Sequence, residues 1–120
     1  MTDYLDPEEW SDLLAGFSRR NRFRRARFET FGRGGVMEEE QEAHLENVKV
    51  KLTGADAPSV TVIRLDNSTA TPIEMITTIP RVRRISPQLD LDDSENGLEI
   101  EDEDGVMAVL RLESEVDGAS

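Results

Sequence analysis

Residues 97–114, GLEIEDEDGVMAVLRLES, contain two segments in which apolar and polar residues alternate, separated by an acidic loop that ends in glycine. This period of two predicts a pair of antiparallel strands, and the loop length decides which residues face one another. A two-residue loop would place Leu98 opposite Arg111, an apolar residue against a charged one. A three-residue loop over residues 103–105 places Leu98 opposite Leu110, so the pattern predicts the three-residue loop.

The predicted turn is a type I turn followed by a glycine bulge, in which Gly105 takes the left-handed backbone conformation at little cost. This register collects the apolar side chains of the hairpin on one face, namely Leu98, Ile100, Val106, Ala108, Leu110 and Leu112. Glu99, Glu101 and Arg111 point to the other face. We therefore expect the rest of the chain to pack against the apolar face.

A helix is predicted over residues 6 to about 20. Asp6 is a suitable N-cap, Pro7 suits the first helical position, and Asn21 suits a left-handed stop. Apolar residues recur at positions i, i+3, i+4 and i+7, as Trp10, Leu13, Leu14 and Phe17. This stripe could form a ridge for a partner, but the chain has only six aromatic residues, so we predict that the stripe belongs to the core.

Short segments with a period of two follow the helix and predict strands. They cover residues 24–30, 38–45, 48–52, 60–65, 73–79 and 82–85, before the two strands of the hairpin. The short connections favour antiparallel neighbours. We predict an α+β fold, with one N-terminal helix packed on a bent, mainly antiparallel sheet or partly open barrel of seven to eight short strands. Residues 1–120 form a single domain with an ordered core over about 5–114, while the acidic loop 88–96 and the tail 115–120 are expected to be mobile.

The composition excludes several kinds of site. The chain has no cysteine and only one histidine, His44, so it lacks the residues for a thiolate or multi-histidine metal site. Its acidic segments do not match a calcium-binding EF-hand loop, because Glu95 stands where the loop that would begin at Asp90 requires glycine. We predict no catalytic residues, no metal and no cofactor. No apolar run approaches the roughly 20 residues of a membrane span, and the acidic N-terminus does not resemble a signal peptide, so we expect a cytoplasmic protein.

The charge of the chain is unevenly distributed. The net charge is −12, yet residues 19–33 contain seven arginines and one glutamate. Residues 86–120 contain twelve acidic residues and one arginine. This asymmetry bears on partners rather than on the fold. The excess of arginine over lysine, twelve to two, fits a high-GC genome as well as a salt-adapted host, and the sequence does not separate the two.

Several short motifs occur in a particular order along residues 7–114. They are Glu9-Trp10, Phe17-Ser18-Arg19, Glu42-Ala43 with Leu45 and Val48, Pro80 with Val82, Leu98-Glu99-Ile100-Glu101, Asp104-Gly105 and Leu110-Arg111-Leu112. In this order the chain resembles a family of small bacterial and archaeal proteins defined as a domain of unknown function, number 5335 in its series. Segments 66–72 and 88–96 are longer than is usual in that family. The resemblance supports the predicted strand order and implies no activity.

The basic segment over residues 19–28 is the candidate surface for partners. Its site residues are Arg19, Arg20, Arg22, Phe23, Arg25 and Arg27, and Arg81, Arg83 and Arg84 would extend the patch if the two strands were neighbours. Arginine mixed with aromatic residues is typical of surfaces that follow phosphates and stack bases. The overall charge of −12 would repel a polyanion. The same residues could instead bind an acidic protein, or form a solvated strand face paired with residues 38–42.

Two classes of function remain open from the sequence. We expect a non-enzymatic interaction or accessory module that binds another protein through the arginine-rich face or a sheet edge, and a free edge could also pair two copies as a homodimer. The alternative is a nucleic-acid-binding accessory protein that uses the same arginine patch. An enzyme acting through His44 or clustered carboxylates has the least support, because no nucleophile–base pair is evident.

Overall fold

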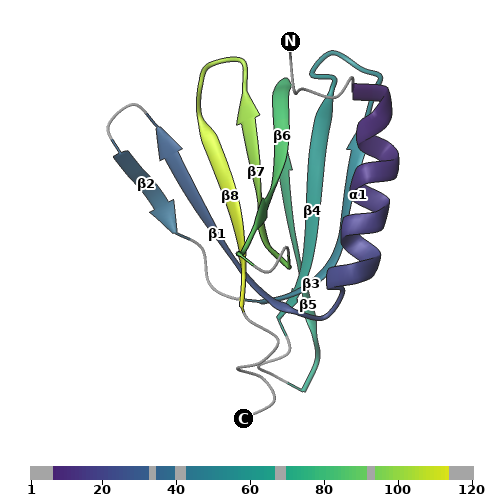
Figure 1. Ribbon diagram of the computed structural model, residues 1–120, viewed down its shortest axis with the longest axis vertical. Helices are drawn as coiled ribbons and strands as arrows, with labels where there is room; N and C mark the ends of the chain where they lie inside the picture. Colours follow the sequence, from purple (N-terminus) through teal and green to yellow (C-terminus); the bar gives the residue numbers. More distant parts are fainter. Residues whose placement is uncertain (1–6, 33–34, 40–42, 67–69, 92–93, 114–120) are drawn as a thin grey trace.

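The computed structural model describes residues 7–32, 35–39, 43–66, 70–91 and 94–113. Over these residues the chain forms one helix followed by eight strands (Figure 1). The elements are α1 (Pro7–Asn21), β1 (Arg25–Gly32), β2 (Gly35–Glu39), β3 (Ala43–Lys51), β4 (Ser59–Asp66), β5 (Ile73–Ile79), β6 (Val82–Leu89), β7 (Glu95–Asp102) and β8 (Met107–Leu112). In this described part of the chain, no helix is long and apolar enough to cross a membrane.

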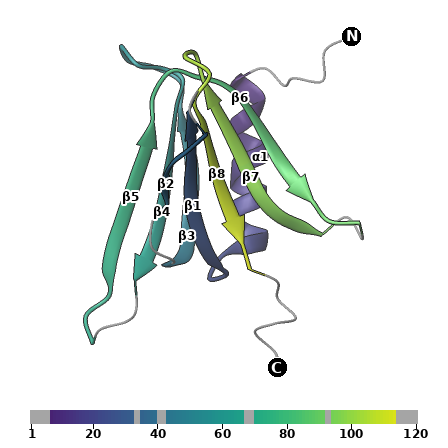
Figure 2. The same ribbon diagram turned by 90° about the vertical axis from the view of Figure 1, so that its left-hand side faces the viewer.

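Seven strands form a continuous antiparallel sheet in the order β5-β4-β3-β1-β8-β7-β6, and β2 pairs with the far end of β1. The sheet is bent into two halves and is not closed into a barrel, with β5 and β6 as the ends of the order (Figure 2). The halves meet where Arg81 and Val82 donate backbone hydrogen bonds to the carbonyls of Asp56 and Pro58, both at 2.8 Å. The predicted α+β class and bent antiparallel sheet are confirmed.

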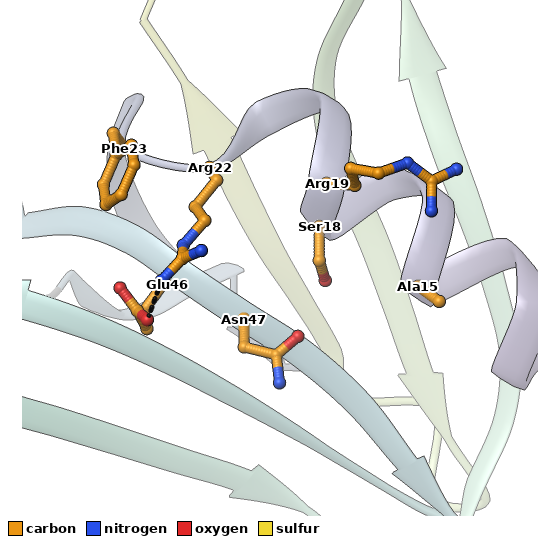
Figure 3. A pocket seen from close by; sticks show the side chains of 7 residues that line it. All are labelled: Ala15, Ser18, Arg19, Arg22, Phe23, Glu46 and Asn47. Carbon is orange, nitrogen blue, oxygen red and sulfur yellow. Dashed lines mark hydrogen bonds and ion pairs between the residues drawn. The ribbon is translucent and has the colours of Figure 1, made fainter.

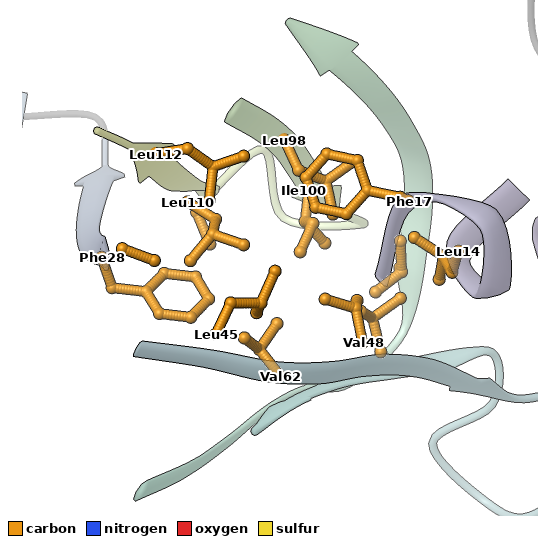
Figure 4. Packing of buried hydrophobic residues seen from close by; sticks show 14 of the residues in the cluster. Leu14, Phe17, Phe28, Leu45, Val48, Val62, Leu98, Ile100, Leu110 and Leu112 are labelled. Carbon is orange, nitrogen blue, oxygen red and sulfur yellow. The ribbon is translucent and has the colours of Figure 1, made fainter. Parts of the chain in front are cut away.

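The hydrophobic core lies between the two halves of the sheet and the helix (Figure 4). Leu98, Ile100, Leu110 and Phe28 face Leu45, Val48 and Val62 across it. Trp10, Leu14 and Phe17 of the helix are buried in the same cluster, so three of the four residues of the predicted helical stripe belong to the core, while Leu13 is half-buried. Burying a large apolar side chain stabilises a fold by roughly 1.5–3 kcal/mol, and this cluster therefore holds the helix on the sheet.

The C-terminal hairpin has the predicted register, with Leu98 opposite Leu110 and Ile100 opposite Ala108. Gly105 has a φ of 82° and donates its N–H to the Asp102 carbonyl at 3.1 Å, while the Asp102 N–H reaches the Val106 carbonyl at 3.0 Å. These are the bonds of the three-residue loop with a glycine bulge. Because β8 also pairs along its length with β1, the hairpin lies in the middle of the sheet.

Three details of the sequence prediction are wrong. The strands predicted over residues 38–45 and 48–52 are in fact β2 and one continuous β3, because an irregularity in register between Leu45 and Asn47 breaks the alternation without ending the strand. Asn21 lies inside the helix, and the left-handed residue after it is Phe23, with a φ of 73°. The loop predicted over residues 88–96 is shorter, because β6 continues to Leu89 and β7 begins at Glu95. The predicted N-cap Asp6 and the tail lie outside the described residues.

Candidate interaction site at the end of the helix

The structure divides the predicted arginine patch into three places. Arg19 and Arg20 lie in the last turn of α1, with Arg22 and Phe23 directly after it. Arg25 and Arg27 lie on β1, and Arg81, Arg83 and Arg84 lie at the start of β6. The strands β8 and β7 separate β1 from β6. Because β1 and β6 are not neighbours, the arginines of β6 do not extend the patch as the sequence predicted.

Most of these arginines are paired with carboxylates of the same chain. The nitrogen–oxygen distances are 2.8 Å for Arg20–Glu95, 2.7 Å for Arg22–Glu46, 3.7 Å for Arg25–Glu113, 4.0 Å for Arg27–Glu29, 3.2 Å for Arg81–Asp56, 3.1 Å for Arg83–Glu101 and 3.0 Å for Arg84–Glu101. Exposed pairs of this kind contribute about 0–1 kcal/mol each to stability. Their larger effect is on the surface potential, because these carboxylates offset much of the charge of the arginines that the sequence suggested for a partner, with Glu101 shared by Arg83 and Arg84.

Arg24, which the sequence did not single out, joins three elements. Its guanidinium donates to the Asn21 side-chain oxygen at 2.8 Å, to the Glu95 carbonyl at 2.6 Å, and through Nε to the Glu113 carbonyl at 3.1 Å. It thereby ties the end of α1 to the start of β7 and to the residue after β8. No local pattern could have shown this, because two of the three acceptors are about seventy or more residues away in the chain.

Glu95 lies beside this network and is the acid most affected by it. Arg20 binds it with two hydrogen bonds, at 2.8 and 2.9 Å, and the Asn21 amide donates to it at 3.0 Å. The hydrogen bond from Arg20 lowers the pKa of the Glu95 carboxyl below its usual value, and partial burial opposes this effect. Glu95 in turn raises the pKa of Arg20. The last turn of the helix is therefore held in place by polar side-chain contacts with Glu95 as well as by packing in the hydrophobic core.

A hollow of about 630 Å³ opens between this end of α1 and β3 (Figure 3). Its lining residues are Ala15, Ser18, Arg19, Arg22, Phe23, Glu46 and Asn47. Ser18 forms its floor, since its hydroxyl accepts from the Val48 N–H at 2.8 Å and donates to the Val48 carbonyl at 3.1 Å. The strand β1 pairs with β3 only near residues 43–44 and has diverged from it at Val48. The Ser18 hydroxyl therefore binds the backbone groups of Val48 that a neighbouring strand would otherwise bind, and the end of the helix forms one wall of the hollow.

Phe23 is the most unusual residue of the hollow. Its side chain is 62% exposed, and its backbone is left-handed, a conformation that costs a bulky residue about 1–3 kcal/mol. The Phe23 N–H donates to the Leu45 carbonyl at 2.7 Å, which holds the strained residue in place. The Arg22 guanidinium lies 4.8 Å from the centre of its ring, in a cation–π contact.

Arg19 differs from the other arginines of the hollow. It is exposed, and its side chain makes no ion pair or hydrogen bond with any residue that the structure describes. Arg22, in contrast, is held by Glu46, as the dashed line in Figure 3 shows. The hollow therefore combines one uncompensated cation, an exposed aromatic ring and the amide of Asn47.

No family model matches the chain, and comparisons with curated proteins and with solved structures also find no match. The resemblance to the domain of unknown function therefore stays a prediction. Within the described residues no group of three or more histidine, cysteine, aspartate or glutamate side chains could hold a metal ion.

Proposed function

We propose that this chain is a non-enzymatic interaction module that binds an acidic, extended segment of another protein in the hollow between α1 and β3. The observation that carries the proposal is Phe23, a large ring exposed to solvent on a backbone that disfavours it. A glycine or asparagine would adopt this backbone more easily. A strained, exposed aromatic residue at the rim of a hollow is best explained by a contact that the ring makes with a partner.

The lining of the hollow indicates the chemistry of the partner segment. Phe23 and Ala15 offer apolar surface, and Arg19 offers a cation to a carboxylate. The Asn47 amide can both donate to and accept from a peptide backbone. A segment with a carboxylate close to a large apolar side chain would match these groups.

The nucleic-acid alternative has less support. A groove that follows phosphates requires a row of cations, because affinity comes largely from the phosphates that the protein neutralises. Around the hollow only Arg19 is uncompensated within the described residues, and Glu46 places a negative charge on the rim. The net charge of −12 adds long-range repulsion.

Selection from a displayed library of random peptides against the purified protein tests the proposal. We expect enrichment of peptides that combine acidic and large apolar residues. Their binding should be lost in Phe23→Gly, a variant that removes the ring and relieves the backbone strain, so that lost binding cannot be attributed to unfolding. Leu89→Ala, which truncates another exposed apolar side chain, is the matched control and should bind as the wild type does.

A charge reversal tests the second contact. Arg19→Glu should abolish binding of the selected peptides, while Lys51→Glu at the far end of β3 should leave it unchanged. Peptides that bind Phe23→Gly and Arg19→Glu as well as the wild type would refute the proposed site. Binding of single-stranded oligonucleotides that falls steeply between about 50 and 200 mM salt and is lost in Arg19→Glu would favour the nucleic-acid alternative instead.

A further inference from the structure

The strand β5 is an open edge of the sheet. It ends the strand order and pairs only with β4 among the described strands, and Figure 2 shows it at the left-hand margin of the fold. Its sequence IEMITTI has one charged residue and no glycine or proline. Natural edge strands are usually protected by lysine, proline, bulges or covering segments. The sequence of β5 contains no lysine or proline, its register with β4 has no bulge, and no other described strand pairs with its open side.

The hydrogen-bonding direction of each β5 residue follows from contacts two strands away. Both backbone groups of Val48 bond to Ser18, so the pair Val48–Val62 in β3 and β4 exchanges no backbone hydrogen bonds. Since bonded and non-bonded pairs alternate in an antiparallel ladder, Val62 must direct its N–H and C=O towards Thr77 of β5. Thr77 then bonds to β4, and its neighbours direct their backbone groups to the open side.

The groups on the open side belong to Glu74, Ile76 and Thr78. We propose that they pair with the same three residues of a second copy of this chain, as an antiparallel two-fold dimer centred on Ile76. In this register Ile76 faces Ile76 of the copy, and Glu74 faces Thr78, giving three pairs that each exchange two hydrogen bonds. Pro72 and Pro80, which lack an N–H, would face each other directly beyond this segment and end the ladder on both sides.

Other registers are less favourable. A shift of one residue would bring outward-directed groups opposite inward-directed ones, so only even shifts can form hydrogen bonds. The even shift that centres the pair on Glu74 would place two glutamates opposite each other, which is repulsive. An even shift centred on Thr77 or Met75 would place a proline in one of the three bonded positions or leave one of them unpaired.

The side chains and the local charge also suit a second copy. Ile76 is 58% exposed and lies opposite Ile63 of β4, so the dimer would form a row of four isoleucines across the two-fold axis. The half of the sheet that carries this edge is nearly neutral, since residues 43–79 contain three basic and four acidic residues. The large negative charge of the chain lies mainly in residues 86–120, most of which belong to the other half.

Sedimentation velocity over a wide range of protein concentration tests the proposal. We expect a monomer–dimer equilibrium whose dissociation constant rises roughly tenfold or more in Ile76→Lys, because two lysines would face each other and the isoleucine contact would be lost. Leu89→Lys is the matched control, since Leu89 is 56% exposed and lies on the other edge strand. A monomer at every concentration, or a dimer that persists in Ile76→Lys, would refute the proposal.

The absence of cysteine allows a direct test of the register. Residues directly opposite in an antiparallel pair have Cα atoms about 4.5–5.5 Å apart, within the range that a disulfide bridges. Mild oxidation should therefore link Ile76→Cys chains, and should link Glu74→Cys to Thr78→Cys in a mixture. Glu74→Cys alone should stay unlinked, because its copies would be about 13 Å apart along the ladder. Equal linking of Ile76→Cys and Leu89→Cys would refute the register.

Discussion

Replacing Arg24 with methionine should destabilise the fold by about 2–4 kcal/mol. The guanidinium donates to three acceptors, the Asn21 side chain and the carbonyls of Glu95 and Glu113. A hydrogen bond from a charged donor contributes about 1.5–3 kcal/mol when it is shielded, and about 1 kcal/mol is appropriate for each of these partly buried bonds. Methionine keeps much of the packing of the aliphatic stem, so that the change reports mainly on the lost bonds.

Urea unfolding followed by circular dichroism measures this effect, and Arg25→Met is its control. Arg25 is the next residue, but its side chain is 58% exposed and its carboxylate partner Glu113 lies 3.7 Å away, so its loss should cost less than about 1 kcal/mol. Arg24→Lys should be intermediate, because an ammonium keeps the charge but cannot reach three acceptors with the geometry of the guanidinium. Equal destabilisation by Arg24→Met and Arg25→Met would refute the structural role of Arg24.

Two further predictions concern β7. Gly97→Ala should destabilise the fold by about 1–3 kcal/mol, because the added Cβ would lie 2.6 Å from the Leu110 carbonyl oxygen in the middle of the sheet. Thermal unfolding measures this loss. Gly105→Ala is the comparison, because the Cβ added there meets nothing within 4 Å and its cost is backbone strain alone. The hydrogen bond from Arg20 lowers the pKa of Glu95 in the fold below its value in the unfolded chain, so Glu95 should contribute stability that is present above the unfolded pKa and is lost as the pH falls through the lower folded pKa. The difference in unfolding free energy between wild type and Glu95→Gln should therefore be constant at neutral pH and shrink in acid, and a difference that grows as the pH falls would contradict the assignment.

The parts of the fold that the sequence predicted are those set by local chemistry. The register of the C-terminal hairpin follows from its loop length, because only the three-residue loop places apolar residues opposite apolar residues. Gly105 supplies the left-handed residue that this loop requires. The helical stripe follows from the period of 3.6, and the core contains Trp10, Leu14 and Phe17 as expected. In both cases the deciding residues are within about two helical turns or one hairpin of each other.

The remaining features depend on contacts between distant segments. The continuity of β3 through Asn47 depends on β4 as its partner, and the helix continues through Asn21 because its side chain bonds to Phe17 and to Glu95. Arg64 is fully buried on the core side of β4, where it donates to the Ala26 carbonyl at 3.3 Å and lies over the ring of Phe28 at 5.1 Å. Alternation with Val60 and Val62 does place Arg64 on the inner face, yet an arginine there gives no sign from sequence alone that it will be buried.

The same limit applies to the candidate site. Arginine-rich composition directed the prediction to the C-terminal end of the helix, but it could not show which arginines meet carboxylates in the folded chain. The acidic residues that compensate them come largely from positions 95–113, the part of the chain that appeared to be the opposite pole of a charge dipole. Folding brings the two poles together, and for this reason the proposed partner surface is confined to the hollow with Phe23 and Arg19.

The two proposed surfaces lie on the same half of the sheet, and this has a consequence for binding. The hollow adjoins β3 at Asn47, which lies opposite Ile63 of β4, and Ile63 lies opposite Ile76 at the edge. A dimer through β5 would therefore present two hollows related by a two-fold axis and separated by the strands β4 and β5 of both copies. A partner with two acidic segments would bind such a dimer more tightly than either hollow alone, because the second contact is intramolecular. A single peptide, in contrast, should bind Ile76→Lys with the affinity of the wild type, which keeps the test of the hollow independent of the test of the dimer.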